Sequence, residues 1–120
     1  MIVVGVGASR GCPDAELRAL VDEALAEADV DARRVDALAT ADIKADEPAV
    51  RALAAHHGWP LHTHSAEDLA RVDVPTPSTV VAAHVGTPSV AEAAALLTSG
   101  GTLVVEKRRS AHATCAIAAS

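Results

Sequence analysis

The residues of this chain that are best suited to chemistry are basic and polar side chains in loops that follow apolar runs. The first loop, Gly7–Gly11, follows the β-branched run Ile2–Val6 and precedes a predicted helix. Glycines there let backbone N–H groups turn toward an anion, the helix N-terminus adds positive potential, and Arg10 could clamp two oxygens. The glycine spacing is one residue longer than the GxGxxG dinucleotide pattern. The loop therefore predicts an anion site; the alternative is that its glycines serve only turning and packing.

Two further charged segments follow predicted strands. Thr40–Glu47 lies past the carboxyl end of the second strand, where open α/β sheets bind ligands, and it contains Lys44, one of only two lysines in the chain. The segment Glu106–Arg109, which contains Lys107, is a basic cluster after the fourth strand. We interpret the two segments as a basic rim for a polycarboxylate ligand. The alternatives are a solvated loop whose acids cap the next helix, and an ordinary charged hairpin turn.

The spacing of the histidines and cysteines indicates neither a metal site nor a nucleophile. His62 and His64 share one face of a predicted strand, but no cysteine or acidic ligand is placed with them. We expect solvent-facing or edge histidines there, and no bound metal. Cys12 lies near a helix start, which can lower the pKa of a thiol. Because it has no obvious partner base, catalytic residues stay unassigned.

Composition excludes several classes of protein. The 120 residues carry a formal net charge of −6, which argues against a general duplex binder. Trp59 is the only Trp, Tyr or Phe, so the stacking surface of single-strand binders is missing. No apolar run is long enough to span a membrane, the start Met1–Val4 lacks the basic residues of a signal peptide, and two cysteines are too few for a disulfide scaffold. We expect one cytoplasmic domain over residues 1–120, with no nucleic-acid or membrane partner.

The elements that must position these groups follow from apolar periodicity and from helix-ending residues. Apolar residues at helical spacing run from Leu17 to Ala28, and Gly58 and Gly100 are placed to end two other helices. The predicted strands are Ile2–Val6, Val35–Ala41, Pro60–His64, Thr102–Val105 and His112–Ala118. The predicted helices are 13–28, 48–57, one turn after Ser65, Ser78–Val85 and Ser89–Ser99.

The predicted order β-α-β-α-β-α-α-α-β-β favours an α/β fold. Strands joined by helical crossovers form a mainly parallel sheet that is covered on both faces. The last two strands, Thr102–Val105 and Thr114–Ala118, are joined by about six residues, which is too few for a crossover, so we expect this pair to be antiparallel. Because ligands bind at the carboxyl ends of parallel strands, Arg10 and Lys44 are expected in one pocket.

Several segments, in order over almost the whole chain, match the pattern of a known family. They are Gly5–Gly7 with Arg10 and Gly11, Leu38–Glu47, Ser65–Leu69, Thr76–Ser78, Gly86 with Ser89–Ala95, and Lys107 with Thr114 and Ala116–Ala118. As a set they resemble the family of CobE and the C-terminal domain of CbiG, of cobalamin (vitamin B12) biosynthesis. In that family the first loop usually reads Gly-x-Gly-Cys-Arg-(Arg/Lys)-Gly; here Ala8 and Ser9 replace the Cys and the first Arg.

The resemblance implies a three-layer α/β/α sandwich with a mixed five-stranded sheet, and a role as an accessory or carrier protein. The expected ligand is a corrinoid or precorrin intermediate, the expected protein partners are other cobalamin-pathway enzymes, and no cofactor is expected. One alternative is a hydrolase that opens the lactone of cobalt-precorrin-5A, as full-length CbiG does; another is an unrelated phosphate- or nucleotide-binding module. The expected ligand-binding residues are Gly7, Arg10, Gly11, Thr40, Asp42, Lys44, Glu47, Thr76, Ser78 and Lys107.

Overall fold

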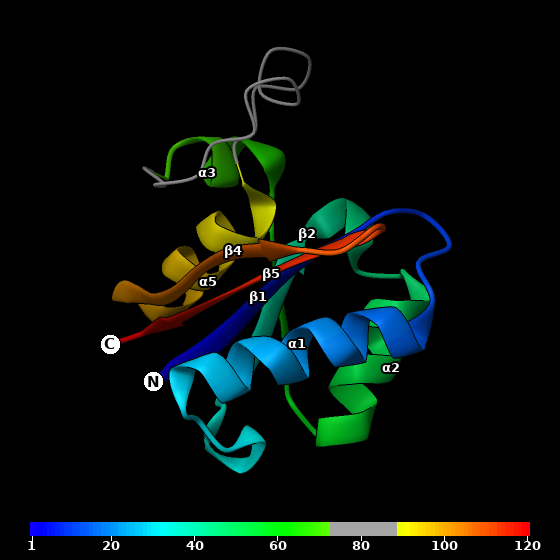
Figure 1. Ribbon diagram of the computed structural model, residues 1–120. Coiled ribbons are helices and arrows are strands. Elements are labelled where there is room, and N and C mark those ends of the chain that lie inside the picture. Colours follow the sequence, from blue (N-terminus) through cyan, green and yellow to red (C-terminus); the bar gives the residue numbers. More distant parts are fainter. Residues whose placement is uncertain (73–88) are drawn as a thin grey trace.

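The computed structural model describes residues 1–72 and 89–120, and within them five strands form one mixed sheet of order β3-β2-β1-β5-β4 (Figure 1). Strand β1 is parallel to β2, and β2 is parallel to β3, whereas β5 runs antiparallel to both of its neighbours, β1 and β4. The predicted mixed sheet and the predicted antiparallel final pair are both confirmed. The strands are β1 Ile2–Ala8, β2 Ala37–Ala41, β3 Leu61–His64, β4 Thr102–Arg109 and β5 Ala113–Ala119.

Helices cover both faces of this sheet, which confirms the three-layer arrangement (Figure 1). Helices α1 (Asp14–Ala28) and α2 (Pro48–His57) pack on one face, and α3 (Ala66–Ala70) and α5 (Val90–Ser99) pack on the other. Short 3₁₀ turns at Ala32–Arg34 and Asp42–Lys44 flank β2. The predicted helix Ser78–Val85 lies outside the described residues.

The two cores differ in the size of their side chains. The face toward α1 and α2 buries large aliphatic residues, among them Leu17, Leu38 and Ile117. The face toward α5 is built mainly from alanines, including Ala93–Ala95, together with Val3. Small residues on both the helix and the sheet let their backbones approach closely, which compensates for the near-absence of aromatic side chains.

The expected helix ends are present. Gly58 ends α2 and Gly100 ends α5, each in the left-handed conformation that glycine tolerates best. Ser65 accepts a hydrogen bond from the Asp68 N–H before α3, and Ser89 accepts one from the Glu92 N–H before α5. No described helix has the length and apolar character needed to cross a membrane.

Strand β4 is longer than its sequence indicates. The prediction that Glu106–Ala111 connects the last two strands is wrong, because β4 continues through Arg109 and pairs with β5 as far as Thr114. Charged residues are tolerated there because β4 is an edge strand, whose exposed side chains reach water. The basic cluster is therefore held on a sheet rather than in a turn.

Candidate functional site

An open cleft of about 450 Å³ lies at the end of the sheet where β1, β2 and β4 finish and β5 begins. This size is in the range of small-molecule sites. Four segments line it: the end of β1 with the next residue (Gly7–Ser9), the end of β2 and the turn that follows (Ala41, Ile43, Lys44), the start of α5 (Ser89, Val90), and the β4–β5 hairpin (Lys107, Arg109 and 110–114).

The lining of this cleft is basic although the chain as a whole is acidic. Lys44, Lys107 and Arg109 line it, and none of the described residues that line it is Asp or Glu. The formal net charge of the chain is −6, so this grouping of cations is local. The first residues of α5 add the positive end of a helix dipole. The cleft is therefore suited to bind an anionic ligand.

A bulge in β4 directs the basic side chains to the cleft. Val105 pairs with Ile117 and Arg108 pairs with Cys115, so β4 carries one extra residue between these two positions. Val105 packs in the core toward α1. A first register shift, between Leu103 and Val105, turns Val105 toward α1 while Leu103 packs on the α5 side. Because alternate residues of a regular strand point the same way, the second shift returns Lys107 and Arg109 to the face of Leu103 and to the cleft.

The carboxylate of Glu92 holds the backbone at this bulge. Glu92, on the first turn of α5, is fully buried, and its Oε2 accepts a hydrogen bond of 2.8 Å from the Lys107 N–H. A buried carboxylate that accepts a backbone N–H satisfies a donor which the bulge removes from the strand ladder. The Glu92 N–H donates to the Ser89 side chain at the start of α5, but its own side chain reaches β4.

Arg108 lies on the other face of β4. Its guanidinium forms an ion pair with Glu27 and lies 3.6 Å from Glu23, both on α1. The neighbouring cations Lys107 and Arg108 thus have different surroundings, one lining the cleft and the other held by acids outside it. This difference makes Arg108 a matched control for the cleft cations.

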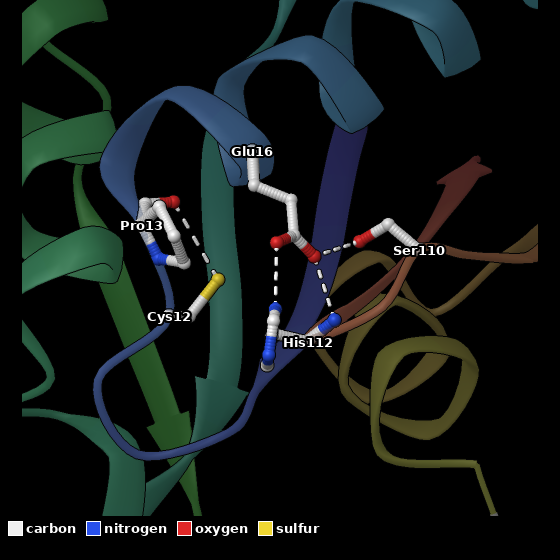
Figure 2. Close-up of polar contacts among 5 residues, drawn as sticks. All are labelled: Cys12, Pro13, Glu16, Ser110 and His112. Carbon is white, nitrogen blue, oxygen red and sulfur yellow. Dashed lines mark hydrogen bonds and ion pairs between the residues drawn. The ribbon is translucent and has the colours of Figure 1, made fainter.

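A hydrogen-bonded cluster joins the first turn of α1 to the β4–β5 hairpin (Figure 2). Glu16 Oε1 lies 2.8 Å from Nδ1 of His112, and Oε2 accepts hydrogen bonds from the His112 N–H, at 2.6 Å, and from the Ser110 hydroxyl. These bonds, first the one from Ser110 and then those from His112, lower the pKa of Glu16 to about 2. Glu16 therefore stays ionised in all ordinary buffers and fixes the orientation of the imidazole.

Cys12, beside this cluster, is not an activated thiol. It is buried, and its Sγ lies 3.6 Å from the Pro13 carbonyl oxygen (Figure 2). Burial raises the pKa of the thiol, and the negative charges of Glu16 and Glu47 raise it further. The thiol is therefore protonated at neutral pH, and the helix start does not activate it.

The structure places the expected ligand-binding residues in different surroundings. Gly7, Lys44 and Lys107 line the cleft. Arg10 is exposed in the β1–α1 loop and does not line it, so its contribution to binding stays a prediction. Asp42 is exposed at the start of the 3₁₀ turn. Thr76 and Ser78 lie outside the described residues.

The other three expected residues form structural hydrogen bonds. The buried Thr40 hydroxyl donates to the Val6 carbonyl oxygen at 2.7 Å. The Gly11 N–H donates to Glu47 Oε1 at 3.0 Å, which ties the β1–α1 loop to the start of α2. Glu47 holds the N-cap position of α2 without a capping bond from its side chain. Its carboxylate thus connects two loops instead of capping the helix.

Sequence reasoning did not single out Glu16, Ser110 or His112 as site residues. Glu16 is 96 residues from His112 in the sequence, so no local spacing could have joined them. The histidines that the sequence did single out lie elsewhere: His62 is exposed on β3, and His64 Nε2 lies 2.7 Å from the Thr98 hydroxyl.

Comparison with protein families and curated proteins identifies relatives of this chain. Residues 2–118 match the model of the family described as "Cobalamin synthesis G C-terminus". The chain is 32% identical over 119 residues to a cobalt-precorrin-5A hydrolase of Priestia megaterium, covering 98% of this chain but 32% of the hydrolase. It is 39% identical over 121 residues to Protein CobE of a Sinorhizobium species, covering 98% of this chain and 79% of that protein. The chain thus spans about a third of the hydrolase and most of the CobE relative.

Solved structures give the same grouping. A crystal structure of CobE, a protein from the cobalamin biosynthetic pathway, matches with a TM-score of 0.88 and 36% identity, over 98% of this chain and 89% of that one. The cobalamin biosynthesis protein chiG from Agrobacterium tumefaciens matches with a TM-score of 0.76 and 34% identity, over 100% and 98% of the two chains. A cobalamin biosynthesis protein G homolog from Sulfolobus solfataricus, at 20% identity and a TM-score of 0.77, shares the fold over 98% of this chain and 36% of its own.

Proposed function

The chain belongs to the cobalamin synthesis G C-terminus family, and from this premise we propose that it is a cobalamin biosynthesis protein, resembling CobE, that binds a corrinoid or precorrin intermediate in the basic cleft. It acts as an accessory or carrier protein, which holds the intermediate and passes it between other enzymes of the same pathway.

The observation that carries this proposal is that the Lys, Arg, Asp and Glu side chains in the described lining of the cleft are all cationic. Corrinoid intermediates are macrocycles whose rims carry several carboxylates, and Lys44, Lys107 and Arg109 would pair with such groups. Ile43, at 84% exposed, is one of the most exposed large apolar side chains and also lines the cleft. It would contact the apolar part of the macrocycle. An open cleft of about 450 Å³ is suited to hold part of such a ring while the rest reaches solvent.

Binding without catalysis agrees with the nucleophiles near the cleft. The Cys12 thiol is buried and its pKa is raised, and the Ser110 hydroxyl donates to a carboxylate that is already held by His112. Neither group is an activated nucleophile of the kind that the lactone-opening alternative would use.

Removing one cleft cation should weaken binding of a polycarboxylate corrin. With hydrogenobyrinic acid, a metal-free corrin with free carboxylates, Lys107→Ala and Arg109→Ala should each weaken the affinity about tenfold, because a carboxylate loses its partner in a partly desolvated site. Raising the ionic strength should weaken binding by the native protein more than by either variant, since screening acts on the charge that was removed. The measurement is a titration followed by visible absorbance at two salt concentrations.

Arg108→Ala is the control, because it removes the same charge one residue away, on the face that pairs with Glu23 and Glu27. Its affinity should stay within about twofold of native, since it keeps every cleft cation. Equal losses in all three variants would mean that net charge, and not the cleft, drives binding. If the native protein binds neither this corrin nor its cobalt-containing form, the proposed function is wrong.

A further inference from the structure

The imidazole of His112, a residue that lines the basic cleft, has one unused ring nitrogen. His112 lines the cleft, and its side chain is 54% exposed. Its Nδ1 lies 2.8 Å from Glu16 Oε1, so the ring proton belongs on Nδ1 when the imidazole is neutral. Figure 2 shows Nδ1 directed at Glu16 and the rest of the ring directed away from it. Nε2 then carries a free lone pair, and no hydrogen bond occupies it among the described residues.

Three hydrogen bonds make this orientation more than a chance contact. The carboxylate of Glu16 is itself held, by the Ser110 hydroxyl and by the His112 N–H at 2.6 Å. A histidine that binds a metal through one ring nitrogen commonly donates the other N–H to a carboxylate, which fixes the tautomer and makes the ligating nitrogen more basic. The cluster therefore has the form of a metal-ligating histidine with its supporting partners.

We propose that Nε2 of His112 is an axial ligand for the cobalt of a corrinoid bound in the cleft. This proposal rests on the proposed function and identifies the cobalt-containing form of the ring as the preferred ligand. One protein ligand is sufficient, because the macrocycle itself supplies the equatorial nitrogens. Imidazole nitrogen is a suitable ligand for first-row transition metals. Nε2 donates its lone pair and displaces one axial water, without a change in oxidation state or proton count.

The cleft cations and His112 would then contact different parts of the bound corrinoid. Lys44, Lys107 and Arg109 face the carboxylates at the rim of the ring, whereas His112 reads the metal at its centre. Loss of a cation should weaken binding of rings with and without cobalt alike. Loss of His112 should weaken binding only of rings that contain cobalt.

The test compares two rings that differ only in the metal: cobyrinic acid, a cobalt corrin with free carboxylates, and metal-free hydrogenobyrinic acid. With cobyrinic acid reduced to Co(II), the native protein should give an electron paramagnetic resonance spectrum split by one axial nitrogen. His112→Ala should lose this splitting and bind the cobalt ring about tenfold more weakly, with unchanged affinity for the metal-free ring. Circular dichroism checks that the variant is folded.

Two further variants separate the proposed roles. Glu16→Gln should keep the nitrogen splitting, because the amide oxygen can still accept from Nδ1, but should bind the cobalt ring about tenfold more weakly. His62→Ala, which removes an exposed histidine on β3, should behave as native.

The outcomes distinguish this proposal from the proposed function. Absence of nitrogen splitting, its persistence in His112→Ala, or its loss in His62→Ala would overturn the axial-ligand proposal, while binding of either ring in the cleft would leave the proposed function in place. If the native protein binds neither ring, the proposed function fails and the axial ligand fails with it.

Discussion

Replacing Gly5 with alanine is expected to lower the free energy of unfolding by about 3 kcal/mol, at the upper end of the usual cost of overpacking a core. Gly5 lies in the central strand β1 beneath α5. A Cβ atom at this position would lie 2.0 Å from the Ala91 carbonyl oxygen and 2.9 Å from the Ala95 Cβ. Backbone cannot move aside as a flexible side chain can, so α5 would have to lift from the sheet. Chemical denaturation measures the loss.

Gly11→Ala is the control for this prediction. A Cβ at Gly11 would meet no atom within 4 Å, but the residue has φ of +79°, which an alanine adopts only with strain. Its cost should be about 1 kcal/mol, from backbone conformation alone. If Gly5→Ala cost no more than Gly11→Ala, the close approach of α5 to β1 would be contradicted.

Glu92→Ala is expected to lower both stability and ligand affinity. The change leaves the Lys107 N–H without its acceptor in a fully buried place and creates a cavity, which together should cost about 3 kcal/mol. Because the bulge in β4 loses its anchor, Lys107 and Arg109 should also be displaced from the cleft. Affinity for hydrogenobyrinic acid should then fall more than tenfold. Denaturation and the absorbance titration measure the two effects.

Two variants define what this result means. Glu92→Gln keeps an oxygen that can accept the Lys107 N–H, so it should retain more stability and affinity than Glu92→Ala. Glu67→Ala removes an exposed acid from α3, and its stability should stay within about 0.5 kcal/mol of native. Native affinity in a folded Glu92→Ala protein would show that the bulge does not depend on this carboxylate.

The antiparallel strand β5 explains why the cleft has a wall that a purely parallel sheet would lack. Because β5 runs antiparallel to β1, the first residues of β5 lie beside the last residues of β1, at the same end of the sheet. The β4–β5 hairpin therefore lies beside the β1–α1 loop, and the Ser9 N–H donates to the His112 carbonyl oxygen at 2.8 Å. This contact also brings His112 to Glu16 on the first turn of α1.

Local features of the sequence were sufficient to predict most elements and the kind of sheet. Helical spacing of apolar residues predicted α1, and glycine or serine at helix ends predicted the limits of α2 and α5. The short connection before Ala113–Ala119 predicted an antiparallel pair. These features can be predicted because each depends on residues only a few positions apart in the sequence. At those positions the backbone preference and the burial of side chains favour the same structure.

The tertiary structure alone decided which side chains meet at the cleft. Lys107 and Arg109 face it by way of two register shifts in β4, which no composition or spacing predicts. Glu92 reaches across from α5 to hold that bulge, and Glu16 orients a histidine 96 residues away. A carboxylate in the first turn of a helix looks the same in sequence whether it caps the helix or binds a distant strand. Only the packing of the layers determines which donor lies within its reach.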